Sequence, residues 1–473
     1  MSEDFQWEDD FQVEELADRF DKMIKDGMEL YFDSEELEML IDYYQATFNS
    51  EKSRQVLDFA IRMHPYSNKI KIKHARQMAT EGFYMKAISL LNEIEITEPA
   101  DAEILMTKGS VYSMMMDFQK AVSEYEKALV MVDDDEMEEV YSSIAFEYEN
   151  MGAFDTALEY LVKALEISAY PEQLLYEIGM CYEMASQLEE SVEFFTKYLD
   201  KQPSSVASWF NLALSYHHLE LFEKAIDAFE YAIAVDEACI PAYLSMAQSY
   251  ASMENFKKAI EVYHDSFEYE KPEALTLYYI GECYEKLLDY GKALEFYHKA
   301  IELDENLPEP WAGIGVIFDE EGKTKIAINY IEKAIELDQL NSEFLLIQAD
   351  MYIKLQMYDK AKECFQRIEQ IDPQDIDLWK EYANMHILKG ETEKAIQILK
   401  TGLIHQPENA SIIYRLAAAL LLNGNQVQAA YYLENALDLN YEGHQELLDY
   451  FPGITKYPKI LEILEKYSAS RQK

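Results

Sequence analysis

Apolar residues recur three or four positions apart along most of this 473-residue chain. They form runs of roughly 13 residues separated by short polar breaks, and this spacing predicts amphipathic helices. The runs come in pairs. The stretch from Ala274 to Leu307 repeats, class by class, the stretch from Val206 to Cys239. The chain is therefore expected to be an array of two-helix repeats with a fixed period.

Small and aromatic residues occupy fixed positions of the repeat. Position 20 is Ala or Ser in every repeat, from Ser53 to Ala429, and position 8 is Gly or Ala everywhere except at Ile41. Aromatic residues recur at positions 11, 17 and 24. Small residues let two helix backbones approach each other, and the aromatic rings fill the space beside them. Each repeat is thus expected to be a closely packed helix pair.

Helix breakers fall between the predicted helices. Proline occupies position 32, between one repeat and the next, at Pro65, Pro99, Pro203, Pro373 and Pro407. Glycine occupies position 15, the predicted turn inside a repeat, at Gly82, Gly152, Gly322, Gly390 and Gly424. Proline suits the first turn of a following helix, and glycine suits a turn that needs positive φ.

The register of the repeats divides the chain into four segments. Residues 1–33 comprise an acidic start and a helical stripe that would cap the array, formed by Phe11, Val13, Leu16, Phe20, Met23 and Ile24. Residues 34–137 hold three repeats and an acidic connector with two extra residues, and residues 138–443 hold nine more. In residues 444–473 we expect a closing helix pair, His444–Phe451 and Pro458–Tyr467, followed by a frayed tail.

This pattern resembles the tetratricopeptide repeat. The pattern of that repeat is, in order, a large apolar residue, Leu, Gly or Ala, Tyr, Ala, Phe or Tyr, Ala and often Pro. The resemblance covers residues 34–443. It implies an all-α, right-handed superhelical solenoid of about twelve helix-turn-helix repeats with a capping helix at each end. It also implies that the first helix of each repeat lines a concave groove, with positions 2, 5, 6, 9, 12 and 13 facing it.

Charge and composition limit the classes of partner that the chain is expected to bind. The chain has 41 basic and 90 acidic residues, a formal charge of −49. Such a surface repels phosphate backbones and anionic lipids, so we expect neither nucleic acid nor membrane as a direct partner. The start lacks the basic and apolar regions of a signal peptide, and no apolar run reaches about 18 residues. A cytoplasmic chain is the simplest expectation.

Motifs for catalysis, cofactors and metals are missing. The sequence contains no GxxxxGK[ST], GxGxxG after a strand, HExxH or GxSxG. Cys181, Cys239, Cys283 and Cys364 form no CxxC pair, and two of them share a packing position of the repeat. The pair His217 and His218 has no matching second pair of ligands. The run from Asp133 to Glu136 lacks the spacing of a calcium loop. We therefore predict no enzyme, no cofactor and no metal site.

Apolar residues at groove positions of repeats three to eight are the main binding candidates. Packing within a repeat uses other positions, and methionines and rings in an open groove suit an amphipathic or extended peptide. The alternative is that the groove is tight and its opposite walls cover these side chains. The candidates are Met106, Met114, Phe146, Tyr176, Met180, Met184, Phe210, Leu214, Leu244 and Tyr278.

Two charged clusters are further candidates. Lys69, Lys73 and Arg76 share one helical face and would hold a partner's carboxylate or phosphate. The alternative is internal neutralisation by acids of the preceding repeat, since interleaved charge on stacked helices is common. Lys380 and Asn384 resemble the first part of the carboxylate clamp of some family members. The resemblance then fails, because Arg415 stands where that clamp has Asn.

The sequence therefore predicts a non-catalytic scaffold or adaptor that holds a peptide or protein segment in its groove. Two alternatives stay open: a regulatory subunit whose acidic surface docks a basic partner, and, less favoured, an enzyme with an unrecognised site. Self-association through the outer face is also left open. We further hypothesise that the acidic first ten residues fold into the basic cluster at Lys69, Lys73 and Arg76.

Overall fold

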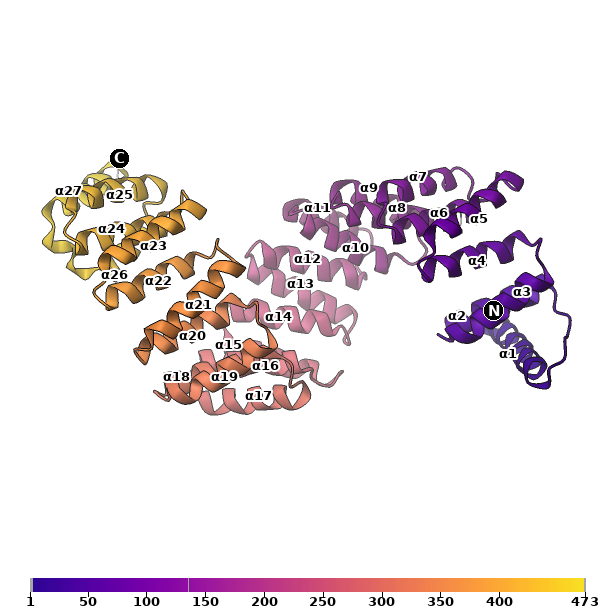
Figure 1. Cartoon of the computed structure of the whole chain (residues 1–473), viewed down its shortest axis with the longest axis horizontal. Coiled ribbons are helices and arrows are strands. Elements are labelled where there is room, and N and C mark those ends of the chain that lie inside the picture. Colours follow the sequence, from indigo (N-terminus) through magenta and orange to yellow (C-terminus); the bar gives the residue numbers. More distant parts are fainter. Residues whose placement is uncertain (1–2, 135, 472–473) are drawn as a thin grey trace. The chain divides into compact units, whose positions relative to one another are not determined.

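In the computed structural model, residues 3–134 and 136–471 are described, and every regular element among them is a helix (Figure 1). The chain divides into two compact bodies, Met1–Ser245 and Met246–Lys473, with the boundary inside helix α14. We call them the N-terminal and C-terminal bodies and describe each by itself. The side chains of residues 1–12 lie outside the described part, and with them the hypothesis that this segment enters the basic cluster.

The helices of both bodies are short and regular. The N-terminal body contains α1 (Glu3–Asp26), α2 (Ser34–Ala46), α3 (Ser50–Met63), α4 (Asn68–Thr80), α5 (Tyr84–Thr97), α6 (Ala102–Met114), α7 (Phe118–Ala128), α8 (Met137–Asn150), α9 (Phe154–Ile167), α10 (Pro171–Met184), α11 (Leu188–Leu199), α12 (Val206–His218) and α13 (Phe222–Val235). The boundary helix is α14 (Ile240–Ser252). The C-terminal body continues with α15 (Phe256–Ser266), α16 (Ala274–Lys286), α17 (Tyr290–Leu303), α18 (Pro308–Glu320), α19 (Thr324–Leu337), α20 (Ser342–Lys354), α21 (Tyr358–Ile371), α22 (Ile376–Leu388), α23 (Thr392–His405), α24 (Ala410–Leu422), α25 (Gln426–Leu439), α26 (His444–Tyr450), the 3₁₀ helix η1 (Pro452–Lys456) and α27 (Pro458–Arg471).

Consecutive helices pack in pairs, as the sequence predicts. In the N-terminal body α6 packs on α7, α8 on α9 and α12 on α13, and in the C-terminal body α16 packs on α17 and α18 on α19 (Figure 1). The first helices of neighbouring repeats also contact each other, for example α10 with α12 and α18 with α20. The predicted all-α fold of stacked helix pairs is therefore confirmed. The boundaries drawn at residues 34, 138 and 444 stay predictions.

In two repeats the glycine at position 8 meets a buried ring of the second helix. A Cβ atom added to Gly109 would lie 2.3 Å from the ring of Tyr125, and one added to Gly281 would lie 2.6 Å from the ring of Tyr297. Both rings come from position 24 and are buried. At Gly109 and Gly281 the close packing of ring on backbone therefore leaves no room for a larger residue, which agrees with the sequence interpretation.

The turn inside every repeat has the same left-handed backbone. Five of the twelve residues at position 15 are glycines, with φ between 70° at Gly152 and 83° at Gly82. The other seven are not glycine, yet they adopt positive φ as well: Phe48, Met116, Ser186, Glu220, Glu254, Leu288 and Gln356. Local backbone hydrogen bonds close this turn even where the residue disfavours positive φ: the Phe48 N–H donates to the Gln45 carbonyl at 3.0 Å, and the Asn49 N–H donates to the Tyr44 carbonyl at 2.8 Å.

The two ends of the chain differ in detail from the expectation. In α1, Leu16, Phe20 and Met23 are buried beside Phe32, whereas Ile24 is 52% exposed and does not belong to the apolar stripe. The last helix continues to Arg471, through residues expected to fray. Both differences reflect exact helix phase and length, which apolar spacing sets only approximately.

Gly281→Ala is expected to destabilise the C-terminal body by about 1–3 kcal/mol, because the new methyl group would overlap the buried Tyr297 ring. The measurement is the midpoint of urea unfolding followed by circular dichroism. Gly291→Ala in α17 is the matched control, since its nearest neighbour would be the Oδ1 of Asp289 at 3.8 Å. Equal midpoints for the two variants would contradict the packing role of position 8.

Candidate functional site

A pocket of about 610 Å³ lies in the N-terminal body, over the first helices α6, α8 and α10 of three successive repeats. Three predicted groove residues line it, one from each helix: Met114, Phe146 and Met180. Their exposed fractions are 44%, 55% and 49%. Large apolar side chains this exposed, gathered in one concave place, are typical of a binding surface.

The other predicted groove residues do not line this pocket. On α10, Tyr176 and Met184 are exposed, and the Tyr176 ring meets the half-buried Phe210 ring edge to face at 5.8 Å between centroids. Met106, Leu214 and Leu244 are half-buried, and Met106 packs against the core of its own repeat.

Tyr278 belongs to the C-terminal body and not to the pocket. Its ring stacks on Tyr297, with the two ring planes 23° apart, and burial raises the pKa of its hydroxyl. The contact serves packing within its own body, so we leave Tyr278 out of the candidate site.

Carboxylates surround the apolar part of the pocket. The lining carboxylates are Glu139, Glu147, Glu149 and Glu177. Two serines of α6, Ser110 and Ser113, and two of α8, Ser142 and Ser143, also line the pocket. Lys and Arg are absent from the lining among the described residues. The site therefore combines an apolar floor with acidic sides.

Glu147 is the least exposed of these carboxylates, at 1%. The Ser113 side chain forms a hydrogen bond with it, whereas its Oε2 atom has no hydrogen-bond partner among the described residues. Burial raises the pKa of Glu147, because the charged form loses solvation. Glu147 thus brings to the pocket lining a buried carboxylate oxygen that has no partner within the described part of the chain.

Glu149 is held by the next repeat. The Sγ–H of Cys181 donates a hydrogen bond of 3.2 Å to its Oε1 atom, yet burial outweighs this contact and raises the pKa of Glu149. The two perturbed carboxylates lie on the same helix, α8, and face the same pocket. An approaching cation would favour the ionised form of both.

Sequence reasoning missed the polar lining of the pocket. Glu139, Ser142 and Glu149 stand at positions 2, 5 and 12 of their repeat, which are groove positions, whereas the prediction for repeats three to eight names only apolar residues. Their position was therefore a sufficient signal. Glu147 and Tyr125 stand at positions 10 and 24, outside the groove set, and gave no such signal.

Ion pairs within the chain engage the basic cluster. Lys69 lies 3.9 Å from Glu38 and Lys73 lies 2.5 Å from Asp42, both on α2 of the preceding repeat. Arg76 instead reaches forward to α6, where its guanidinium contacts Glu103 at 3.1 Å and the Thr107 hydroxyl at 3.1 Å. The cluster thus holds neighbouring first helices together.

Lys380 and Asn384 on α22 also have partners within the C-terminal body. Lys380 pairs with Asp377 at 3.0 Å, and the Asn384 amide donates to Glu381 at 3.2 Å and accepts a hydrogen bond of 3.4 Å from the Tyr450 hydroxyl. The Arg415 guanidinium lies over the Tyr450 ring, 3.6 Å from its centroid. These contacts join α22, α24 and α26.

Histidine and cysteine side chains take part in local contacts. His218 lies 3.2 Å from Glu183, and the His217 ring packs on Phe222. All four cysteines are buried and unpaired with one another. In the described part of the chain, no group of three or more His, Cys, Asp or Glu side chains is arranged to hold a metal ion.

Comparison with known families decides the family. Models of the tetratricopeptide repeat match residues 138–170, 173–205, 195–239, 240–271, 274–307, 308–339 and 342–375. The chain is a tetratricopeptide-repeat protein. The predicted resemblance is thereby confirmed. Proteins of this family generally bind protein or peptide partners and are generally non-catalytic, so the coarse function is that of a protein-interaction scaffold.

Individual relatives are distant. A general transcriptional corepressor, trfA, of Dictyostelium discoideum is 26% identical over 125 residues, which is 26% of this tetratricopeptide-repeat chain and 9% of the corepressor. Among solved structures, the Cut9–Hcn1 hetero-tetramer of APC/C is similar over 86% of this chain and 90% of that chain, with 16% identity and a TM-score of 0.42. A tetratricopeptide-repeat protein of Parabacteroides merdae is similar over 53% of this chain and 98% of that chain, with 15% identity and a TM-score of 0.44.

Within residues 3–134 and 136–471, no helix is both long enough and apolar enough to cross a bilayer.

Glu147→Gln is expected to raise stability at pH 8 by on the order of 1 kcal/mol, because it removes a charge from a buried position. The pKa of Glu147 is higher in the folded chain than its ordinary value of 4.5. Its protonated form therefore favours folding below about 4.5, and this contribution is lost as the pH rises through the folded-state value. The gain from Glu147→Gln should consequently shrink between pH 8 and pH 5.

Thermal unfolding at the two pH values, followed by circular dichroism, measures this difference. Glu139→Gln is the control, since Glu139 lines the same pocket from the same helix but is exposed. A Glu147→Gln variant less stable than the parent at both pH values would show that the carboxylate is structurally required.

Proposed function

We propose that the N-terminal body binds a segment of a partner polypeptide in the pocket over α6, α8 and α10. The segment places an apolar side chain against Met114, Phe146 and Met180. It directs a basic side chain toward the carboxylates of α8 and α10. The proposal rests on one observation: exposed apolar side chains and carboxylates line the same pocket, and no Lys or Arg stands among its described lining residues.

The apolar floor supplies the driving force. Two methionines and a phenylalanine lose solvent contact when a side chain docks on them, at about 25 cal/mol per Å² of apolar area buried. Unbranched methionine side chains adapt their shape to the ligand. Ordering the segment consumes part of this gain, so we expect a dissociation constant on the order of micromolar.

The acidic sides supply the preference for a basic segment. Lysine and arginine carry the donors that the buried Oε2 atom of Glu147 lacks within the described chain. A charge-assisted hydrogen bond in a desolvated site also discriminates strongly against acidic segments. The basic cluster on α4 is engaged in ion pairs with neighbouring helices, so we assign the electrostatic contact with the ligand to the carboxylates.

In cellular terms the chain acts as a scaffold or adaptor, without chemistry of its own. The alternative of a regulatory subunit that docks a basic partner over its acidic surface is supported by the charge of −49. The two functions differ in the dominant interaction, which is local apolar burial in the first and long-range attraction in the second.

Phe146→Ala/Met180→Ala is expected to weaken binding of a groove peptide by about tenfold or more, since it removes two sides of the apolar floor. The probe is a 12-residue peptide selected from a random displayed library against the whole chain. The peptides selected from the library should contain an apolar residue close in sequence to a Lys or an Arg. Fluorescence anisotropy of the labelled peptide gives the dissociation constant.

Met85→Ala/Tyr170→Ala is the matched control. Both side chains are exposed in the N-terminal body, at 70% and 86%, and neither lines the pocket. Affinity within a factor of about two of the parent chain is expected for this control. If both double variants bound the peptide equally well, the pocket would not be the binding site.

Added salt separates the two functions. Raising NaCl from about 0.05 M to about 0.5 M shortens the screening length several-fold and weakens attraction between exposed charges. Pocket binding should lose only about threefold in affinity, because apolar burial is insensitive to salt. A loss on the order of a hundredfold in the same titration would favour surface docking of a basic partner.

A further inference from the structure

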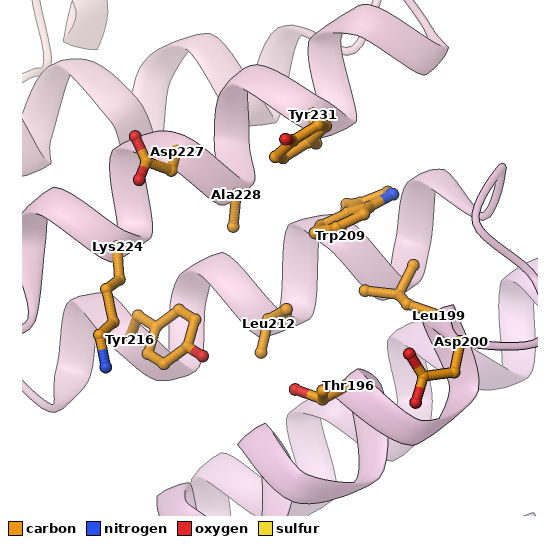
Figure 2. A pocket seen from close by; sticks show the side chains of 10 residues that line it. All are labelled: Thr196, Leu199, Asp200, Trp209, Leu212, Tyr216, Lys224, Asp227, Ala228 and Tyr231. Carbon is orange, nitrogen blue, oxygen red and sulfur yellow. The ribbon is translucent and has the colours of Figure 1, made fainter.

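A second pocket, of about 430 Å³, lies on the N-terminal body away from the groove pocket. It is bordered by α11, α12 and α13 (Figure 2). On α12 it uses Trp209, Leu212 and Tyr216, whereas the groove candidates of that helix are Phe210 and Leu214. With 3.6 residues per turn, these two sets lie on opposite sides of the helix. The second pocket is therefore independent of the proposed peptide site.

Aromatic rings stand at both ends of the second pocket. At one end the Trp209 and Tyr231 rings stack, with centroids 4.6 Å apart and planes 21° apart. At the other end lies Tyr216, with the Lys224 ammonium 5.4 Å from the centre of its ring. Figure 2 shows the Ala228 methyl group between the two ends, and Thr196 faces them across the opening.

Four other repeats of the chain fill the corresponding space with a ring of their own. Ala228 is position 23 of its repeat, and a ring at that position packs on the ring at position 11. The centroid distances are 5.8 Å for Tyr160 on Tyr148, 5.7 Å for Phe194 on Tyr182, 5.5 Å for Phe296 on Tyr284 and 5.3 Å for Tyr330 on Phe318. At Ala228 the partner ring, Tyr216, is present and the filling ring is missing.

The repeat that begins at residue 308 shows the filled version most completely. There Tyr330 lies between Trp311 at position 4, 6.2 Å away, and Phe318 at position 11, 5.3 Å away. The repeat of Ala228 has an aromatic residue at both of these positions, Trp209 and Tyr216. Its pocket therefore corresponds to the space that the Tyr330 ring occupies in the repeat that begins at residue 308.

The polar edge of the pocket selects the kind of ring. In the repeat that begins at residue 138, the Tyr160 hydroxyl donates a hydrogen bond of 3.4 Å to Glu126, which is position 25 of the preceding repeat. The residue at position 25 that precedes Ala228 is Thr196, and it lines the pocket. A phenol placed like Tyr160 would thus direct its hydroxyl toward the Thr196 hydroxyl, which serves as donor and acceptor.

We propose that this pocket binds a tyrosine side chain of a partner polypeptide, inserted between Trp209 and Tyr216 above the Ala228 methyl group. The ring occupies the place that Tyr330 and Tyr160 occupy in their own repeats. Leu212 and Leu199, both buried, form the apolar floor. The Thr196 hydroxyl forms a hydrogen bond with the phenol hydroxyl. Offset stacking on the flanking rings adds to the burial of apolar area.

The test uses N-acetyl-tyrosinamide as the probe and the whole chain labelled with 5-fluorotryptophan. The chain has four tryptophans, and the fluorine resonance of Trp209 is the one that disappears in Trp209→Phe. The probe is expected to shift this resonance saturably, with a dissociation constant on the order of millimolar, and to leave the other three in place. N-acetyl-leucinamide should give a shift at least several-fold weaker.

Ala228→Tyr supplies the missing ring from within the chain. This variant is expected to unfold at the same temperature as the parent or a higher one, and to lose the response to the probe. Thr196→Val is the second variant. Thr196→Val should weaken the affinity for N-acetyl-tyrosinamide several-fold and leave the affinity for N-acetyl-phenylalaninamide unchanged. This variant keeps the test informative if Ala228→Tyr does not fold.

Four results would overturn the proposal. They are the absence of a saturable Trp209 shift, an equal response to the tyrosine and leucine probes, a response retained in folded Ala228→Tyr, and no change in tyrosine affinity in Thr196→Val. A Trp209 resonance that moves with the concentration of the chain alone would identify a second copy of the chain as the occupant, against a separate partner.

Discussion

The close approach of a small residue on the first helix of a repeat to a large side chain on the second is the interaction on which this fold depends. Gly109 against Tyr125 and Gly281 against Tyr297 leave no space for a methyl group. These contacts use the face of the first helix that carries position 8, whereas positions 9 and 13 lie about 100° and about 140° round the helix from it. Met114, Phe146 and Met180 occupy positions 9 and 13, stay exposed and line the groove pocket.

The fold was predictable because its determinants are local and repeated. One helix pair is specified by apolar spacing, by small residues at positions 8 and 20 and by helix breakers at positions 15 and 32. Because the pattern recurs many times, it stays recognisable despite an irregular repeat such as the one that contains Ile41 and Ser53. The phase of a single helix lacks this averaging, which explains the misplacement of Ile24 and of the last turn of α27. Repeat periodicity carries no information on how far a terminal helix continues.

The candidate site was predictable only in part. Position in the repeat located Met114, Phe146 and Met180 but could not say which of the ten apolar candidates share a pocket, since side-chain reach between helices decides that. Reach also explains why Arg76 pairs forward with Glu103 while Lys69 and Lys73 pair backward with α2. The space above Ala228 corresponds to the place of a ring in other repeats, and this correspondence is recognised only when the packed rings of the repeats are compared.

The seven residues other than glycine at position 15 bear on how the array comes apart. Each holds a left-handed backbone that costs about 1–2 kcal/mol relative to the ordinary helical region. The backbone hydrogen bonds that close these turns lie within each repeat, whereas burial of the outer apolar faces of a helix pair requires the neighbouring repeat. Unfolding should accordingly spread from repeat to repeat by nearest-neighbour coupling.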